Sequence, residues 1–304
     1  MKKVIYIGGP TGVGKSEIGV KLAKKINGEI ISCDAFQVYK YMNIGTNKIK
    51  KDEMEGIPHH LIDIIDPNEE FSSGLYKEIA LKKIDEIINK GKMPIIVGGT
   101  GLYLRTLLYF DPPEKDDTIR KNLLERVNKE GLDSLYEELK RVDPEYANKI
   151  SKNDKKRIVR ALEVFYIYNK PFSTFQNMIE RFDSIKIALI MDRKLLYEKI
   201  KDRVERMFER GFVEEVKYIN EKFGFSKTSI KAIGYEEVLK YLKGEINITT
   251  CKNEIIKKTK EYARKQIIWL RKEKDIIFIN IENKDSEKVV DEILEIVRNR
   301  WKIS

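Results

Sequence analysis

One stretch near the N-terminus has the spacing of a phosphate-binding loop, G-x-x-x-x-G-K-S. It consists of Gly9, Pro10, Thr11, Gly12, Val13, Gly14, Lys15 and Ser16. Its glycines let successive backbone N–H groups point inward at the start of a helix, which makes a cradle for an anion. Lys15 would supply a positive charge for the outer phosphate, and the Ser16 hydroxyl is a ligand for Mg²⁺. The stretch therefore predicts binding of a diphosphate or triphosphate, rather than a glycine-rich turn that holds nothing.

The elements around this loop have the pattern of an α/β sheet. An apolar run at 4–7 precedes it, and a helix-patterned segment at 17–26 follows it. Further strands are expected at 29–32 and at 93–97, the latter an unbroken apolar run typical of a buried parallel strand. Because ligands of such sheets bind beyond the carboxyl ends of the strands, the residues that follow each strand are candidates for the same site.

Two of these strand ends carry informative residues. Asp34 follows the second strand, and spacing alone leaves two roles open: a proton or hydrogen-bond acceptor beside the phosphates, or the N-cap of the turn at 35–37. The strand at 93–97 leads into a second glycine-rich turn, 98–101, which contains Thr100. An ATP-hydrolysing enzyme commonly has an aspartate there that holds Mg²⁺. Its absence favours a transferase whose leaving group is a phosphate chain.

The composition describes a globular chain. The 304 residues are 41% hydrophobic and 36% charged, enough for a large core in one or two domains. No apolar run approaches the roughly 20 residues of a membrane helix, and the first strand begins too early to leave room for a secretion signal. The two cysteines, Cys33 and Cys251, give no disulfide framework or metal-spaced set. We therefore expect a cytoplasmic protein that does not enter a membrane.

The net charge of +10 is unevenly distributed. The segment 193–274 holds 22 Lys and Arg against 13 Asp and Glu. A second, local concentration consists of Lys149, Lys152, Lys155, Lys156, Arg157 and Arg160. Such charge is what a polyphosphate backbone requires of its partner, although composition alone equally allows a solvated, lysine-rich surface.

The rest of the chain divides into a core and an insertion. The segment 113–183 is helical in pattern and reads as a small all-helical insertion, so that 1–112 and 184–304 form a parallel sheet flanked by helices, of the P-loop NTPase type. An expected helix at 195–210 places Lys199 and Arg203 on one face, where they either reach the crevice or pair with neighbouring carboxylates.

Two other segments leave alternatives open. The helix expected at 253–274 interleaves Tyr262 and Trp269 with basic residues, a pattern for stacking on bases, although such an aromatic stripe is more often core. His59 and His60 precede a short strand expected at 61–65. Because adjacent side chains of an extended segment point to opposite faces, we expect these two histidines to have structural or hydrogen-bonding roles rather than to bind one metal.

Blocks along the chain resemble the signature blocks of the tRNA dimethylallyltransferase family. They occur in the family's order and cover most of the chain, and the ordered set is far more specific than any single block. The blocks are 9–16, Asp34 with 37–39, 59–63, 98–103, 153–157, 160–163, 232–235 and 262–269.

The resemblance implies a reaction and roles for residues. The enzyme would move the dimethylallyl group from its diphosphate to the exocyclic N6 of the adenosine just 3′ of a tRNA anticodon, a base that must leave its stack to be reached. Asp34 would act as general base. Charge on the departing diphosphate would be stabilised by Thr11, Lys15, Thr100 and Arg203, with Mg²⁺ at Ser16. The residues expected to contact the tRNA are Asp34, Ala35, Phe36, Gln37 and Thr100 and, in the insertion, Lys156, Arg157, Ile158, Val159 and Arg160. We expect a monomer.

One departure from the family pattern and two rival functions remain. The family usually has a serine after the aspartate, and Ala35 lacks that hydroxyl. A first rival is a relative that prenylates free adenine nucleotide, against which the basic C-terminal third and the insertion argue. A second is a small-molecule kinase built on the same loop, for which the missing aspartate after Val97 is unfavourable.

Overall fold

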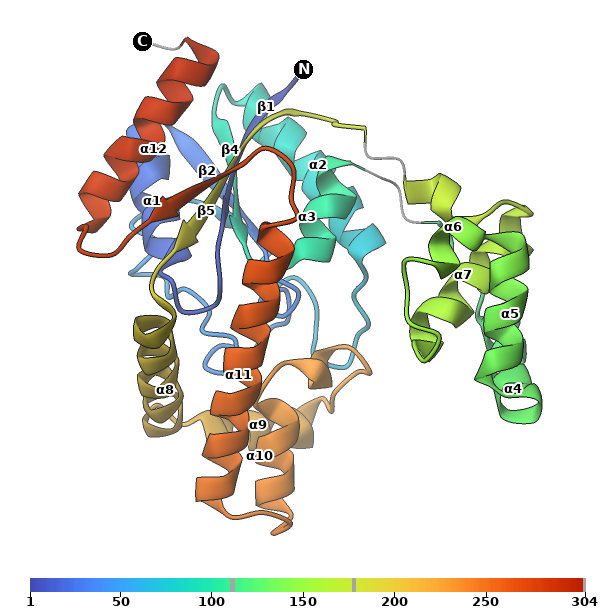
Figure 1. The fold of residues 1–304 in the computed structure, drawn as a ribbon. Coiled ribbons are helices and arrows are strands. Elements are labelled where there is room, and N and C mark those ends of the chain that lie inside the picture. The colour runs from blue at the N-terminus through green and yellow to red at the C-terminus, as the bar shows by residue number, and fades with distance from the viewer. Residues whose placement is uncertain (110–112, 177–178, 303–304) are drawn as a thin grey trace. The chain divides into compact units, whose positions relative to one another are not determined.

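The chain folds into two compact units, one of which is made of two separate stretches. The computed structural model describes residues 1–109, 113–176 and 179–302. Met1–Leu104 and Phe182–Ser304 form the first unit, and Arg105–Arg181 forms the second. We predicted the helical insertion at 113–183, whereas the second unit starts earlier along the chain, at Arg105. The ribbon of each unit is drawn in Figure 1.

The strands of the described residues form one parallel sheet in the first unit, in the order β3-β2-β4-β1-β5-β6. The strands are β1 (Lys3–Gly8), β2 (Gly28–Cys33), β3 (His59–His60), β4 (Met93–Gly98), β5 (Asp183–Ile190) and β6 (Ile276–Asn280). Nearly every residue of β1, β2 and β4 is buried, as expected of central parallel strands covered on both faces. The sequence prediction of a parallel sheet flanked by helices is therefore confirmed.

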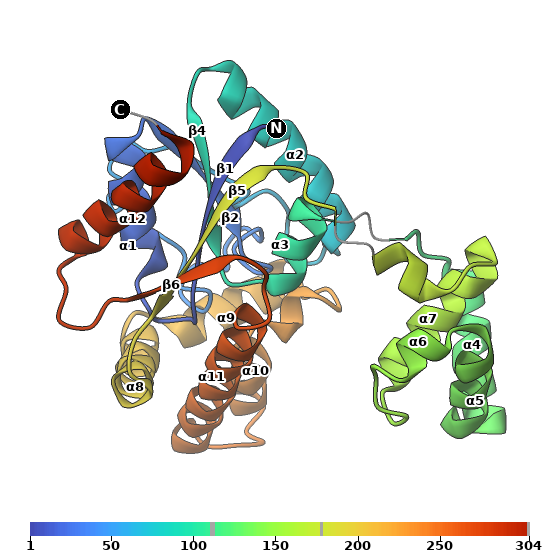
Figure 2. The same cartoon turned by 45° about the horizontal axis from the view of Figure 1, so that its top comes forward.

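Helices cover both faces of this sheet (Figure 2). They are α1 (Lys15–Lys25), α2 (Ser73–Asn89), α3 (Gly101–Leu108) and α12 (Ser286–Trp301). The pair α1 and α12 packs on one face, in a core cluster that includes Ile5, Ile7 and Ile187. Helices α2 and α3 lie over the opposite face. This layering fixes the carboxyl ends of the strands as the exposed edge where loops can form a site.

A second group of helices gathers beyond the carboxyl ends of the strands (Figure 1). It consists of α8 (Arg193–Glu209), α9 (Phe212–Lys222), the 3₁₀ turn η2 (Ser229–Lys231), α10 (Tyr235–Leu242) and α11 (Ile248–Leu270). The helices expected at 195–210 and 253–274 are thus α8 and α11, whereas α9 was not predicted. Asp192 begins α8, because its side chain accepts hydrogen bonds from the backbone N–H groups of Lys194 and Leu195.

The segment around the two histidines differs from the sequence prediction. The strand expected at 61–65 is wrong, since β3 contains only His59 and His60, and Leu61 and Asp63 have positive φ angles of 62° and 55° that end the extended backbone. His60 Nε2 lies 2.7 Å from Glu29 Oε2, and His59 Nδ1 lies 2.8 Å from the Ile57 carbonyl. The expected hydrogen-bonding role of both histidines is confirmed.

The charge of Glu29 is stabilised where the side chain is buried. Burial acts to raise the pKa of this carboxyl, but hydrogen bonds from Lys92, His60 and Lys90 prevail and lower the pKa to about 2. The cluster ties β2 to β3 and to the loop before β4. It is therefore structural, on the sheet itself rather than at its carboxyl edge.

The second unit is a small bundle with its own core. Its helices are α4 (Asp117–Glu130), α5 (Leu132–Val142), α6 (Pro144–Ala147), α7 (Lys155–Tyr168) and the 3₁₀ turn η1 (Phe172–Gln176). Leu123, Leu135, Leu139 and Leu162 are among the buried residues of the core. None of the helices in the described parts of the chain is long and apolar enough to cross a lipid bilayer.

Glu163 is the charged residue at the centre of this bundle, and its removal should destabilise the unit. Its side chain is fully buried, accepts hydrogen bonds from Arg120 and from the Asp116 N–H, and lies 3.1 Å from Arg160 Nη1. Glu163→Ala removes the acceptor of Arg120 and of the Asp116 N–H, so we expect the bundle to lose about 3 kcal/mol of unfolding free energy. Hydrogen exchange of α7 amides measures this loss. Glu137→Ala, at an exposed ion pair with Lys140, should change little.

Candidate active site

The phosphate-loop motif forms a tight turn between β1 and α1. Gly9, Gly12 and Gly14 all have positive φ angles, of 146°, 87° and 94°. At Gly9 a side chain would also collide, because its Cβ would lie 2.7 Å from the Leu189 carbonyl oxygen of β5. Gly14 is the N-cap of α1, so the loop ends at the positive end of a helix. These are the conditions under which backbone N–H groups can hold phosphate.

Lys15 holds the loop from inside. Its ammonium donates hydrogen bonds to the carbonyl oxygens of Gly9 at 3.0 Å and Pro10 at 2.9 Å. Burial lowers the pKa of Lys15 to about 8, with Asp34 acting to raise it and Arg203 to lower it further. The ammonium therefore still carries its charge at neutral pH, in a place where that charge is poorly solvated.

Arg203 of α8 reaches the same loop. Its Nη1 donates to Thr11 Oγ1 at 2.7 Å, and burial lowers its pKa while the charge of Asp34 acts to raise it. Because Thr11 Oγ1 accepts this bond, the hydroxyl proton of Thr11 remains free to point at a ligand. Arg203 is thus the member of the Lys199–Arg203 pair that hydrogen-bonds to the phosphate loop.

Asp34 follows β2, and its negative charge acts on both Lys15 and Arg203. Its Oδ1 accepts hydrogen bonds from the N–H groups of Phe36 at 2.9 Å and Gln37 at 3.4 Å, so the capping role considered for it is present. Within the described residues no protein group donates a hydrogen bond to its other oxygen, Oδ2. Since capping uses one oxygen, the second remains available as an acceptor.

Thr100 connects the second glycine-rich turn to the Asp34 loop. Its Oγ1 accepts a hydrogen bond from the Ala35 N–H at 3.0 Å, and its own N–H donates to the Cys33 carbonyl at 3.1 Å. Gln37, the last residue of this loop predicted to contact RNA, accepts from Ser32 Oγ at 3.2 Å. The turn after β4 therefore fixes the position of the loop after β2.

Helix α11 contributes Gln266, which the sequence did not assign to the site, beside Tyr262 and Trp269, for which base stacking and a place in the core were both left open. Gln266 accepts a hydrogen bond from the Thr11 N–H at 2.8 Å, and Tyr262 and Trp269 lie one turn to either side on the buried half of the helix. Burial and then the charge of Asp34 raise the pKa of Tyr262, so its hydroxyl is neutral. Trp269 packs against Gly101. The signal that could have found Gln266 is a polar side chain on the apolar face that Ala263 and Leu270 define.

The residues predicted to contact RNA from the second unit need a correction. Ile158 and Val159 are 0% and 4% exposed and belong to the core of the bundle, because the helical period turns them inward. Lys156 and Arg157 are exposed in the first turn of α7. Arg160 is half-buried, and its guanidinium donates to the carbonyl oxygens of Pro113 and Glu114.

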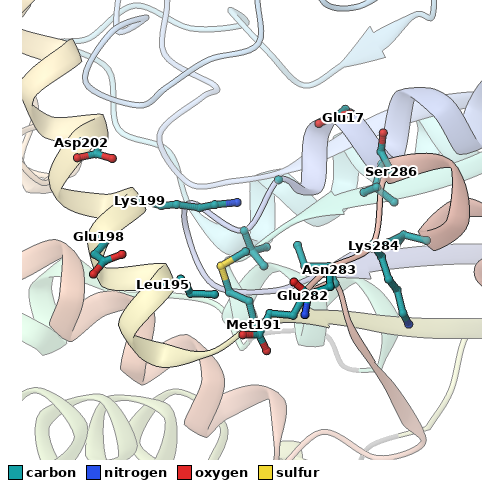
Figure 3. A pocket seen from close by; sticks show the side chains of 15 residues that line it. Glu17, Met191, Leu195, Glu198, Lys199, Asp202, Glu282, Asn283, Lys284 and Ser286 are labelled. Atoms are coloured by element: carbon teal, nitrogen blue, oxygen red, sulfur yellow. The ribbon is translucent and has the colours of Figure 1, made fainter.

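A cavity of about 510 Å³ lies beside the phosphate loop, between the start of α1, α8 and the loop before α12. In Figure 3 the Lys199 side chain extends from α8 into it, toward the start of α1. Its other charged residues include Glu17, Glu198 and Asp202. Neither Asp34 nor Arg203 lines it, so it borders the cluster of Asp34, Lys15 and Arg203 rather than containing it.

The side chains of the site bear on where a magnesium ion could bind. In the described parts of the chain no group of three or more His, Cys, Asp or Glu side chains is arranged to hold a metal. Mg²⁺ often keeps several waters and takes one or two protein ligands together with substrate phosphates. Ser16 is exposed in the first turn of α1. It therefore fits a magnesium site with few protein ligands, in which a diphosphate supplies most of the oxygen ligands.

Comparison with known proteins identifies the family. The family model described as IPP transferase matches residues 37–273. The chain is 43% identical to the tRNA dimethylallyltransferase of Caldanaerobacter subterraneus, over 99% of both chains, and 42% identical to that of Acetivibrio thermocellus, over 95% of both.

Solved structures agree with these relatives. The full-length tRNA isopentenylpyrophosphate transferase of Bacillus halodurans has a TM-score of 0.76 at 34% identity, covering 99% of this chain and 97% of that one. A eukaryotic dimethylallyltransferase acting on tRNA has a TM-score of 0.83 at 31% identity, covering 99% of this chain and 80% of that one. The fold of these neighbours, a P-loop NTPase-like sheet flanked by helices, is the fold described above. The chain therefore belongs to the IPP transferase family, that of the tRNA dimethylallyltransferases.

Proposed function

We propose that this protein transfers a dimethylallyl group from dimethylallyl diphosphate to the exocyclic N6 of the adenosine 3′-adjacent to a tRNA anticodon. The carbon–oxygen bond of the donor breaks, a carbon–nitrogen bond to N6 forms, and the products are the prenylated adenosine and diphosphate. The observation that carries the proposal is the pairing of a phosphate loop and two cations with the carboxylate of Asp34, whose Oδ2 accepts no protein hydrogen bond among the described residues. The names of the relatives support the proposal, because they describe dimethylallyltransferases of tRNA.

The cations act on the leaving group. The diphosphate would lie in the cradle of residues 9–16, against Lys15 and the hydroxyl of Thr11 that Arg203 orients. As the carbon–oxygen bond breaks, negative charge grows on the diphosphate oxygen that was bonded to the carbon. Hydrogen-bond donors already held at that position stabilise the charge without having to reorganise. Burial strengthens this effect, because the same exclusion of water that lowers the pKa of Lys15 also lowers screening.

Asp34 acts on the acceptor. The exocyclic N6 of adenosine is a weak nucleophile, and its proton has to leave as the new bond forms. Asp34 Oδ2 can accept a hydrogen bond from that amine and take the proton, while Oδ1 stays bonded to Phe36 and Gln37 and holds the loop. Thr100 holds the same loop through Ala35.

Mg²⁺, bound by Ser16 and the diphosphate, would add positive charge at the leaving group. The protein's own share is to present the Ser16 hydroxyl at the N-terminus of α1 and to exclude water around Lys15.

The RNA is gripped in this proposal by the exposed cations of the helical unit. Lys156 and Arg157 lie in the first turn of α7, where the positive end of the helix adds to their charge. Replacing both by alanine should weaken binding of an anticodon stem-loop about tenfold and lower the salt slope of log Kd by about 1.5. The turnover number at saturating RNA should stay the same. Lys129→Ala with Arg141→Ala, two exposed cations of the same unit, is the matched control.

Mass spectrometry of anticodon-loop nucleosides tests the function directly. Incubation of the protein with tRNA and dimethylallyl diphosphate should give an adenosine heavier by one five-carbon group at the position 3′ of the anticodon. AMP is offered beside tRNA because a nucleotide prenyltransferase would prenylate it. γ-Labelled ATP is offered because a kinase would transfer the label to an acceptor. Labelled phosphate on any acceptor, with no prenylated adenosine, would contradict the proposal.

A further inference from the structure

Gln266 joins the two glycine-rich turns of the site. Its side chain is only 6% exposed, and both ends of its amide are used. Oε1 accepts a hydrogen bond from the Thr11 N–H at 2.8 Å, and Nε2 donates to the Gly99 carbonyl oxygen at 3.0 Å. The first turn follows β1 and the second follows β4, so one side chain of α11 links the ends of two neighbouring strands.

The second turn is shaped to admit this side chain. A Cβ on Gly99 would lie 2.1 Å from Gln266 Nε2, and a Cβ on Gly101 would lie 2.3 Å from the ring of Trp269. A Cβ at either position would force the Gln266 amide or the Trp269 ring to move, so the missing side chains let α11 come this close to the turn. The close packing of α11 on this turn therefore determines the position of the Gln266 side chain.

Thr11 is fixed from two sides as a result. Gln266 takes its backbone N–H, and Arg203 donates to its Oγ1 at 2.7 Å. Beyond Gln266 the connection continues from Gly99 to the next residue, Thr100, which holds the Asp34 loop through the Ala35 N–H. A continuous path of short contacts thus runs from the phosphate loop to the carboxylate loop.

We propose that Gln266 is a positioning residue that sets the distance between the diphosphate of the donor and the amine held by Asp34. The inference rests on the proposed function. Its role is positioning rather than catalytic, because the hydrogen bonds of its amide go to Thr11 and Gly99, in the two turns that hold the reactants. It acts on the rate because transfer needs the two reactants in a near-attack geometry, and a displacement of about 1 Å can cost on the order of 100-fold.

Gln266→Met and Gln266→Glu test the inference. Methionine has a similar length but makes neither hydrogen bond, so we expect kcat to fall about 10- to 100-fold with the KM for the donor and the Kd for RNA within about threefold. Ile268→Met, at an exposed and uncharged position of α11, is the control and should match the wild type. A Gln266→Met protein with wild-type kcat, or one whose loss lies in KM alone, would overturn the inference.

Gln266→Glu is read out by the pH dependence of kcat, which should not change if the side chain has a merely structural role. The ionised carboxylate can still accept from Thr11 but repels the Gly99 carbonyl, whereas the protonated acid can donate to it as the amide does. The ratio of Gln266→Glu to wild-type kcat should therefore rise as pH falls, and a flat ratio would contradict the positioning role even where Gln266→Met is unstable. If the wild-type protein transfers no prenyl group, the proposed function is wrong, whatever the role of Gln266. That result is obtained before any variant is compared.

Discussion

Replacing Asp34 by asparagine is expected to lower kcat by about 10²- to 10⁴-fold, the usual contribution of a general base. Asparagine keeps an oxygen that can accept from the N–H groups of Phe36 and Gln37, so the loop after β2 should keep its shape. Asparagine has an NH₂ group in place of Oδ2, and this group cannot take a proton from the acceptor amine. Single-turnover transfer of the prenyl group measures the effect, and the Kd for an anticodon stem-loop should stay within about threefold because the phosphate contacts are elsewhere.

The control for this substitution is Asp52→Asn, which changes an exposed carboxylate of the same unit away from the site. It should leave both the transfer rate and RNA binding unchanged. A transfer rate for Asp34→Asn near that of the wild type would remove Asp34 from the role of base and leave it only its capping bonds. Loss of RNA binding with a normal rate on saturating RNA would instead assign it to recognition.

The parts of the site that the sequence could predict are those encoded locally. The phosphate loop lies within eight residues, and its glycines are needed for backbone angles that follow directly from the turn. Asp34 and Thr100 were predicted for the site because Asp34 directly follows one buried strand and Thr100 lies in the turn after another, and the strands of a parallel sheet end at the same edge. Hydrophobic periodicity sufficed for the strands β1, β2 and β4 and for the helices α1, α8 and α11, since the burial that it reflects is a property of each segment.

The parts that the sequence missed depend on contacts between distant segments. Thr11 and Gln266 are 255 residues apart, and nothing near either one indicates the other. The continuous run 156–160 was treated as one surface, although the period of a helix turns Ile158 and Val159 into the core.

The unpredicted helix α9 had a further consequence. Its Glu215 accepts hydrogen bonds from the N–H groups of Asn43, Ile44 and Gly45 and from the hydroxyl of Tyr235. The loop that begins at Asp34 is therefore anchored at its far end by a carboxylate from another part of the chain. The candidate site thus combines motifs that the sequence shows with supports that only the packed chain reveals.

Lys15→Met is the second substitution with a large expected effect. It removes the cation that contacts the loop carbonyls of Gly9 and Pro10 and, in the proposed reaction, the outer phosphate. Loss of one such preorganised donor costs about 10²- to 10³-fold in rate. We expect kcat/KM for the donor to fall by about this factor while binding of RNA alone is unchanged. An unaltered kcat/KM would mean that the donor is held elsewhere than at the loop of residues 9–16.

The pH dependence of the wild type provides an independent check on Lys15, without any substitution. Burial lowers the pKa of this ammonium to about 8, so the free enzyme loses the charge as pH rises through that value. A neutral amine attracts a diphosphate less, and kcat/KM reports the groups of the free enzyme, so kcat/KM for the donor should decline above pH 8. Lys15→Arg keeps its charge throughout this range, and whatever its absolute rate, its profile should lack the decline. The same decline in Lys15→Arg would trace it to another group, because arginine does not titrate there.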